Sequence, residues 1–506
     1  MKGNSEMKTK AVFSLLLAAL TLTSVMASCG GDTTTATPTD TKAVDTEATV
    51  ETEETLKSLV PDGLDFGGET MRILSSSYFE TDAFTMHVDE ATGDVVNDAV
   101  YNRNLALENK FNVKLTYEDN YLNGGTDIAV TIRKSVTAGS DDYDIIFGCQ
   151  YNLAPLVLDN IMLNLEGQEY LHLDQPWWYQ NHINEMSIGH DKTYFVTGDI
   201  TLNVLRNMGC MYVNKQVYAQ NYESVEDLYT EVLDGKWTFD RLAENCMEMY
   251  RDLNGDGAFD DDDQYGIGVI TANLTDHFTY AAGIRATTRD NDNIPVLTMN
   301  NEKTVTHTQK LYSLYYENPG VRVFKADYNS LDIVMPGKFN ENELLYLPGW
   351  FYTAELLRNM DVDYAVIPFP KYDESQETYL SLAHDISVTA CLPTTCSKVE
   401  QATAIMEEMA FLGYRDVLPA YYEIAIKVKY NRDSTDAAMQ ILDIIHDNCT
   451  TDFAFIYNYA LGGVGLIERD LMTGKKSDFS SMYAKKEKTY EKKLAELVDV
   501  FTSIDS

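Results

Sequence analysis

The sequence predicts an α/β protein made of two lobes. Between residues 70 and 147, short apolar strands alternate with amphipathic helices, a rhythm typical of a largely parallel sheet with right-handed crossovers. The chain has 506 residues, more than a single hydrophobic core usually serves. The later part adds further strands and becomes mainly helical toward the C-terminus. Together these observations indicate two cores instead of one.

The first expected lobe opens with five elements. They are a strand at 70–74, a helix at 97–111 that begins at Asn97 or Asp98, a strand at 112–117, a helix at 127–136 and a strand at 143–147. In a parallel sheet, ligands bind beyond the carboxyl ends of the strands. Here those ends are followed by residues 75–80 and by residues 148–151. We therefore expect ligand-binding side chains in these two loops.

The middle and the end of the chain contain further helices and strands. The expected elements are helices from Trp237 to about Arg251 and at 306–316, a strand at 343–347, a helix from about residue 353, and strands at 363–367 and 385–392. No internal repeat is found. After the N-terminal apolar run, no stretch is long enough to cross a membrane.

The N-terminus predicts export and a lipid anchor. Lys8 and Lys10 precede an apolar run that is too short to span a bilayer, so residues 1–28 are interpreted as a signal peptide. The sequence around Cys29 is similar to a lipobox, although Met26 stands where most lipoboxes have Leu. The alternative is an ordinary signal peptide with an accidental cysteine. Residues 29–60 are rich in Thr, Ala, Asp and Glu and are expected to form a disordered tether at the extracytoplasmic face of the membrane.

Charge and motif content exclude several classes of function. The chain has 79 Asp and Glu against 39 Lys and Arg, which argues against nucleic-acid binding. Six cysteines follow Cys29, without a C-x-x-C pair or metal-knuckle spacing, and the sequence does not say whether they pair. No nucleophile elbow, H-E-x-x-H, P-loop or dinucleotide fingerprint is present. No pair of carboxylates stands out for glycoside hydrolysis, so we expect no catalysis.

Several motifs occur in an order that resembles a known family. They are Asp141–Phe147, Pro176–Tyr179, Lys192–Asp199, Tyr212–Lys215, Lys338–Trp350 and Pro368–Pro370. From about residue 65 to 420, the chain resembles extracellular solute-binding protein family 1, the sugar-binding lipoproteins of ABC importers, and more distantly the maltose-binding proteins. The resemblance implies the type II periplasmic-binding-protein fold, with hinge strands between two lobes that close on a ligand.

The same resemblance implies the lobes, the ligand and the partners. Residues 61–203 with 364–415 would form the first lobe, and residues 204–363 with 416–506 the second. The expected protein is a monomer that captures a carbohydrate, above all an oligosaccharide, and delivers it to ABC permease subunits. Two alternatives stay open at this point. One is a surface-anchored carbohydrate-active hydrolase, and the other is a receptor for a non-sugar solute.

Three tryptophans are candidate platforms for a sugar ring, because aromatic faces pack against the C–H face of a pyranose. Trp350 follows a predicted strand at a position that resembles a sugar-stacking tryptophan of the family. Trp177 and Trp178 are adjacent and point different ways, so at least one belongs to a core. Candidate groups for sugar hydroxyls are Asp199, Gln150, Tyr78 and the pair His384 and Asp385. The alternative for each is a loop cap or a surface polar group.

Residues 252–263 match the D-x-N-x-D-G calcium loop. The expected ligands of a structural Ca²⁺ are the side chains of Asp252, Asn254, Asp256 and Asp260 and the backbone carbonyl of Ala258. Such loops usually close with Glu at position twelve, where this chain has Asp263. In several solute-binding relatives the residue after position nine, here Asp261, closes the site instead. The alternative is a solvated acidic turn.

Overall fold

The computed structural model describes residues 56–121, 127–422 and 436–503. The signal peptide, Cys29 and nearly all of the tether lie outside these residues, and residues from Lys57 onward form one unit. Within the described ranges, no helix has both the length and the apolar character needed to cross a membrane. The six cysteines after Cys29 are buried, and none of them forms a disulfide within this part of the chain.

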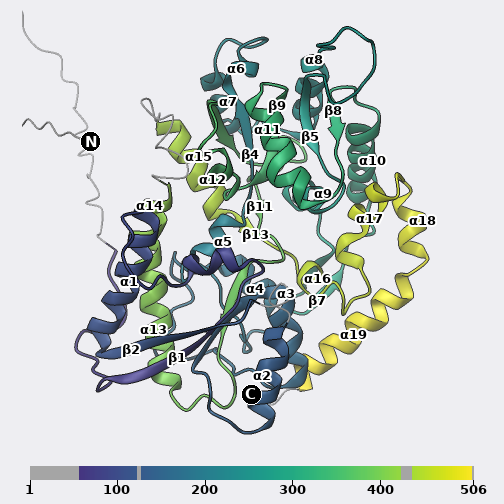
Figure 1. Ribbon diagram of the computed structural model, residues 1–506. Helices are drawn as coiled ribbons and strands as arrows, with labels where there is room; N and C mark the ends of the chain where they lie inside the picture. Colours follow the sequence, from purple (N-terminus) through teal and green to yellow (C-terminus); the bar gives the residue numbers. More distant parts are fainter. Residues whose placement is uncertain (1–55, 122–126, 423–435, 504–506) are drawn as a thin grey trace, which may run out of the picture. The chain divides into compact units, whose positions relative to one another are not determined.

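The first sheet has the strand order β12-β3-β1-β2. Its strands β1 and β2 can be seen in Figure 1. Its strands are β1 (Glu69–Ser75), β2 (Val113–Asp119), β3 (Ile145–Cys149) and β12 (Val388–Cys391). β1 runs parallel to β2 and β3, and β12 is antiparallel to β3. The carboxyl ends of β1 and β3 therefore share one sheet edge with the amino end of β12. All four expected strands of this sheet are confirmed, with ends shifted by one to three residues.

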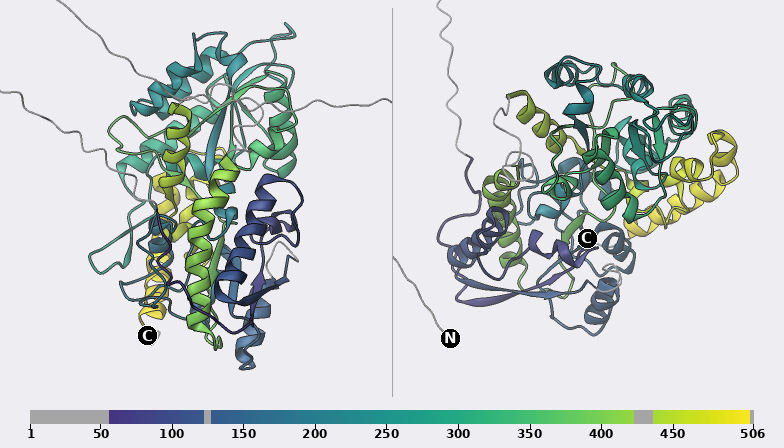
Figure 2. Two further views of the ribbon diagram at one scale, coloured as in Figure 1. Left: turned by 90° about the vertical axis from the view of Figure 1, so that its left-hand side faces the viewer. Right: turned by 45° about the horizontal axis from the view of Figure 1, so that its top comes forward.

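Helices α1 (Val95–Phe111) and α2 (Asp127–Thr137) connect these strands, as expected. α1 begins after Asp94, not at Asn97 or Asp98. The Asp94 carboxylate accepts hydrogen bonds from the backbone N–H groups of Val96 and Asn97. This N-cap pairs two of the donors that a helix start leaves free. α13 (Val399–Leu412) lies alongside α1 (Figure 2).

The second sheet has the order β10-β4-β9-β5-β8. Its strands are β4 (Gly209–Asn214), β5 (Tyr265–Val269), β8 (Val321–Val323), β9 (Leu344–Trp350) and β10 (Tyr364–Ile367). β5 is parallel to β8 and β9, whereas β4 is antiparallel to β9 and β10. The carboxyl end of β9 thus lies beside the amino end of β4, with Trp350 opposite Gly209.

The remaining elements are mostly short helices. They are η1 (Glu80–Thr85), α3 (Gln150–Leu153), η2 (Ala154–Asp159), α4 (Gln180–Met186), α5 (Leu202–Arg206), α6 (Lys215–Tyr218), α7 (Val225–Leu233), α8 (Phe239–Met249), α9 (Asn273–Ala281), α10 (Glu302–Tyr316), η3 (Ser330–Val334), α11 (Met335–Asn340), α12 (Thr353–Leu357), η4 (Gly413–Val417), α14 (Leu418–Tyr422), α15 (Asp436–Asp447), α16 (Phe453–Ile456), η6 (Val464–Leu466), α17 (Ile467–Thr473), α18 (Phe479–Ala484) and α19 (Glu487–Ser503). The expected helices near residues 237, 306 and 353 are α8, α10 and α12.

The expected lobe boundaries need correction. Residues 364–415 are expected in the first lobe, but β10, at residues 364–367, pairs with β4 in the second sheet. The C-terminal part also divides, because α14 packs against α1 while α15 packs against α7 and β10. The sheet to which a strand belongs depends on pairing with residues distant in sequence, and local apolar patterns carry no information on that pairing.

Among the described residues, three of the segments that pass between the two sheets lie side by side (Figure 1). The first contains α5, and the second contains β11 (Ser381–Leu382). The third contains β13 (Cys449–Thr450), which pairs in parallel with β11. An isolated antiparallel bridge joins Met208 to Ala383. Chain segments far apart in sequence are therefore hydrogen-bonded to one another where the lobes connect.

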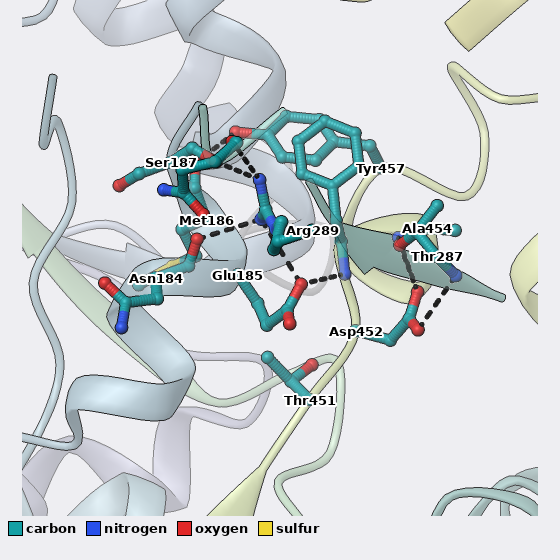
Figure 3. A network of polar contacts seen from close by, with 12 residues as sticks. Asn184, Glu185, Met186, Ser187, Thr287, Arg289, Thr451, Asp452, Ala454 and Tyr457 are labelled. Carbon is teal, nitrogen blue, oxygen red and sulfur yellow. Dashed lines mark hydrogen bonds and ion pairs between the residues drawn. The ribbon is translucent and has the colours of Figure 1, made fainter. Parts of the chain in front are cut away.

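A hairpin outside the two sheets adds a polar cluster that includes the buried Asp452 (Figure 3). It consists of β6 (Thr287–Arg289) and β7 (Pro295–Leu297). Arg289 donates to the carbonyl oxygens of Ser187 and Asn184 at 2.7 and 2.8 Å, beside the end of α4. Asp452 accepts from the backbone N–H groups of Ala286 and Thr287. We call Glu185, Arg289, Asp452 and the groups bonded to them the hairpin junction.

Candidate ligand-binding site

Side chains that follow the strand ends of both sheets come together. Tyr78 and Phe79, after β1, place their rings 6.1 and 5.4 Å from the ring of Tyr328, which comes from the second-sheet part of the chain. The His384 ring, shortly before β12, lies 5.4 Å from that of Trp350 at the end of β9. We call the group Tyr78, His277, Tyr328, Trp350, Tyr352, His384 and Asp385 the candidate ligand site.

Trp350 occupies the carboxyl end of β9 and is 2 % exposed. Its ring is stacked on Tyr352, with 5.5 Å between centroids and 12° between planes. The Tyr352 hydroxyl donates to Asp332 at 3.0 Å, which fixes the stacked ring. The indole Nε1 of Trp350 is buried and has no hydrogen-bond partner within the described residues. A buried N–H without a hydrogen-bond partner destabilises the folded protein by about 1–3 kcal/mol. Such a group is typical of a site where a ligand or a water molecule binds.

His277, on α9, lies directly beside Trp350. Its ring is stacked on Phe369 at 5.3 Å and meets the Trp350 ring at 5.3 Å and 79°. The residue is 1 % exposed, and neither ring nitrogen finds a partner in the described part of the chain. Burial, with smaller contributions from the nearby charges of His384 and Arg469, holds the pKa of His277 well below its usual value. The imidazole is therefore neutral.

His384 and Asp385 form a charged corner of the candidate ligand site. The amide nitrogen of Asn273 lies 2.7 Å from His384 Nε2, and Asp385 Oδ1 lies 2.7 Å from Nδ1. Burial raises the pKa of Asp385, but the charges of His384 and Arg469 outweigh it and leave the pKa below its usual value. Asp385 is thus a carboxylate, and its side chain is 30 % exposed.

The cations near this corner are already paired. Arg469 Nε donates to Asp276 at 3.1 Å, and burial, opposed by Arg469, raises the pKa of Asp276 to about 6. Arg206 bridges Asp82 at 2.8 Å and Glu355 at 2.7 Å, linking η1 to α12. Neither guanidinium is left to neutralise an anionic ligand. The electrostatics favour a neutral ligand, oriented by hydrogen bonds.

Two of the expected tryptophans lie elsewhere. Trp177 and Trp178 are buried, and their indole nitrogens donate to the two carboxylate oxygens of Glu407 at 3.0 and 2.9 Å. Glu407 is on α13 and fully buried, and burial raises its pKa. This geometry fixes both rings against α13, and the structure does not bring them to Trp350.

The expected hydroxyl-binding groups also divide. Gln150 is buried, donates to the carbonyl oxygen of His384 at 3.1 Å and lies 2.7 Å from His182. Asp199 accepts from the Tyr179 hydroxyl at 2.7 Å and lies 3.4 Å from His446. It belongs to a separate region, next to a pocket of about 360 Å³ that Tyr179 and His446 help to line. Tyr78 and His384 therefore join Trp350, with Gln150 behind His384.

Sequence reasoning missed three members of the candidate ligand site. Tyr352 follows Trp350 by two residues, so its proximity could have been found from the sequence. Tyr328 and His277 carry no such signal. His277 sits within a helix, and its approach to Trp350 depends on Gly209, a residue of the neighbouring strand. A Cβ atom at Gly209 would lie 2.2 Å from His277 Nδ1.

The acidic loop at residues 252–263 is folded by its own side chains. Gly255 and Gly257 adopt positive φ of 76° and 74°. The Asp252 carboxylate accepts from both glycine N–H groups at 2.6 and 2.9 Å. Asp263 is buried and accepts from the Tyr250 hydroxyl at 3.0 Å, whereas Asp261 is paired with Arg322 at 2.8 Å. In the described ranges, no three His, Cys, Asp or Glu side chains converge closely enough to hold a metal ion.

Comparisons with known proteins bear on the fold. No protein-family model and no curated protein matches the sequence. The structure is similar to the sugar-binding protein MalE from Xanthomonas citri, with a TM-score of 0.57 and 10% identity over 86% of this chain and 99% of that one. It is similar to a cyclo/maltodextrin-binding protein complexed with maltotetraose, with a TM-score of 0.52 and 10% identity over 86% and 96% of the two chains.

A third similar structure is an ABC transporter solute-binding protein from Thermotoga lettingae bound to α-D-tagatose. Its TM-score is 0.51, with 14% identity over 84% of this chain and 100% of that one. At such low identities the likeness establishes the arrangement of the chain. The expected α/β fold, with two sheets joined by crossing segments, is confirmed.

Proposed function

We propose that this chain, which has the type II periplasmic-binding-protein fold, captures a carbohydrate outside the cytoplasm and delivers it unchanged to an ABC permease. The observation that supports this most is the environment of Trp350. The indole of Trp350 is stacked on Tyr352, and its buried N–H has no partner among the described residues. Its ring lies 5.4 Å from that of His384, which is paired with the Asp385 carboxylate. Similar structures are described as binding sugars, among them maltotetraose and tagatose.

The chemistry of these groups suits a sugar. Aromatic rings offer apolar area to the C–H face of a pyranose, and neighbouring polar groups bind its hydroxyls. Tyr78 and Phe79 meet Tyr328 from the other sheet, so aromatic rings close the candidate ligand site from both sides. Closure of two lobes around a ligand is the known behaviour of this fold. An oligosaccharide ligand, transport through ABC permease subunits and a monomeric state are parts of the proposal.

A thermal-shift screen of residues 57–506, which form one unit, tests the proposal. A sugar that binds the native state stabilises it by mass action and so raises Tm. At a sugar concentration of 100 times Kd, the free energy of unfolding rises by about 2.7 kcal/mol. We expect a rise with one class of sugar and recovery of that sugar intact. A cleaved product would establish the hydrolase alternative. A shift only with amino acids, peptides or ions would establish a receptor for another solute.

The proposal includes lipid anchoring through Cys29, which lies outside the described residues. Acyl chains on this cysteine would hold the protein at the extracytoplasmic face, because each buried methylene contributes about 0.8 kcal/mol. Metabolic labelling with an alkynyl fatty acid should mark the wild type and not Cys29→Ser. Release of the Cys29→Ser protein into the medium would accompany the loss of label. Equal membrane retention of both proteins without label would contradict the anchor.

A structural Ca²⁺ in residues 252–263 is also part of the proposal. Its ligands would be Asp252, Asn254, Asp256, Asp260, the carbonyl of Ala258, and Asp263 in preference to Asp261. Asp263 faces the loop interior, whereas Asp261 is engaged by Arg322. Binding requires these carboxylates to turn from backbone amides toward one ion.

The calcium site is tested by Tm measured with Ca²⁺ and with chelator. Chelation should lower Tm of the wild type and of Asp261→Asn, and should leave Asp252→Ala unchanged. An equal Tm of the wild type in both conditions would exclude the ion.

A further inference from the structure

Two buried polar groups without partners lie side by side in the candidate ligand site. They are the indole N–H of Trp350 and the imidazole of His277, whose ring centroids are 5.3 Å apart. They do not hydrogen-bond to each other, and no other described residue bonds to them. Leaving adjacent buried groups unpaired costs about 1–3 kcal/mol for each, so the arrangement needs an explanation.

The protein fixes the His277 ring firmly. Phe369 stacks on one face at 5.3 Å and 20°, and Trp350 meets it edge to face. Gly209 lies opposite Trp350 in the sheet and leaves the space that His277 Nδ1 occupies, since a Cβ there would lie 2.2 Å away. A phenylalanine could make the same ring contacts without an unpaired nitrogen. The imidazole nitrogens are therefore not needed for packing.

The chemistry of the pair selects a class of ligand group. The indole nitrogen can only donate, whereas a neutral imidazole has one donor and one acceptor nitrogen. A hydroxyl can accept from Trp350 and at the same time donate to His277. An ammonium group cannot accept from the indole. A carboxylate would be repelled by the ionised Asp385, which adjoins the ring of His384.

We propose that His277 is a specificity-determining residue that binds one hydroxyl of a neutral polyhydroxylated ligand, together with the Nε1–H of Trp350. This inference rests on the proposed carbohydrate-binding function and deepens it. Trp350 supplies ring stacking to any sugar of suitable shape. His277 makes recognition depend on a hydroxyl at one ring position. A ligand that lacks this hydroxyl leaves both nitrogens unpaired, and discrimination of this kind is strong.

The test compares His277→Phe with the wild type by titration calorimetry. The ligand is the sugar found in the thermal-shift screen, used together with its series of monodeoxy analogues. Phenylalanine keeps the contacts with Phe369 and Trp350 and removes both nitrogens. We expect unliganded His277→Phe to have an equal or higher Tm and to bind the parent sugar about 10-fold to 100-fold more weakly. His87→Phe is the matched control, because that ring is also stacked, on Tyr117 at 4.1 Å, but lies outside the site.

The series of deoxy analogues distinguishes a failure of the proposed function from a failure of the proposed role of His277. The wild type should reject one deoxy analogue strongly, and His277→Phe should lose the discrimination at that position alone. If no sugar binds the wild type, the proposed function fails, and the role of His277 with it. If sugars bind but His277→Phe shows unchanged affinity and unchanged discrimination, only the role of His277 is overturned.

A spectroscopic measurement covers the case in which His277→Phe does not fold. The ¹⁵N resonances of the His277 imidazole in the wild type should shift when the sugar is added, since one nitrogen gains a hydrogen bond. The parent sugar should shift them, and the rejected deoxy analogue, at a concentration that saturates the site, should not. Resonances that stay unmoved at saturation with the parent sugar would overturn the inference.

Discussion

The hairpin junction and the candidate ligand site both contain buried polar groups, but the hydrogen bonding of these groups differs. In the junction, Asp452 accepts four hydrogen bonds, from Ala286, Thr287 (backbone and hydroxyl) and Ala454. Arg289 has an unpartnered Nε, yet its terminal nitrogens donate to α4 and to the residue after it. In the candidate ligand site, the nitrogens of Trp350 and His277 have no partner among described residues.

The difference shows that buried polar groups can have two roles in a protein. Groups that are satisfied inside the chain join segments distant in sequence and stabilise one arrangement of them. Groups left unsatisfied lower the stability of the empty protein and become favourable when a ligand supplies the missing partner. Substitutions in the two regions should therefore have opposite signatures. Changes in the junction should alter stability, and changes in the candidate ligand site should alter affinity.

The largest expected effect is on stability, in Asp452→Ala. Four donors would lose their acceptor, and each donor that stays buried without one costs about 1–3 kcal/mol. We therefore expect the free energy of unfolding to fall by at least about 3 kcal/mol. Urea unfolding of both proteins measures it. The protein that remains folded should bind sugar with wild-type affinity. A stable Asp452→Ala protein with weakened binding would break the comparison.

A smaller loss of stability is expected for Trp177→Phe. This change leaves one oxygen of the buried Glu407 without its indole donor, at about 1–3 kcal/mol. Urea unfolding should show the loss, and titration calorimetry should show an unchanged Kd. Trp178→Phe should lose less stability, because the Glu407 oxygen that it bonds also accepts from the backbone N–H of His172 at 3.0 Å. A rise in Kd without a loss of stability would place these rings at the ligand after all.

The last effect concerns pH and His446, and it is the smallest when counted per pH unit. Burial lowers its pKa, but Asp199 and Asp447 outweigh burial and raise the pKa to about 10. Because folding raises the pKa of His446, the protonated ring stabilises the fold fully below about pH 6.5. This stabilisation is lost as the pH rises toward 10, by at most about 1.4 kcal/mol per pH unit. Unfolding measured from pH 6 to 10 should show this loss, and His446→Gln should reduce it. Identical slopes for both proteins would contradict the pairing of His446 with Asp199.

The sequence allowed most of the fold to be predicted. Alternating strands and helices located the first sheet, and the carboxyl end of β9 located Trp350, because both are local patterns. The place of β10 in the second sheet could not be predicted, since it depends on pairing with β4. The bonds from Trp177 and Trp178 to Glu407 join residues more than two hundred positions apart. His277 enters the site through the space left at Gly209, which no local pattern reveals.

The central claim is that Trp350 is the platform of a sugar-binding receptor. Titration calorimetry of the wild type and Trp350→Ala, with the sugar found in the thermal-shift screen, tests it most directly. We expect the wild type to bind and release the sugar intact, and Trp350→Ala to bind at least about 10-fold more weakly, since stacking on an aromatic ring and one hydrogen bond are both lost. Equal Kd values for the two proteins, or recovery of a cleaved sugar, would contradict the account.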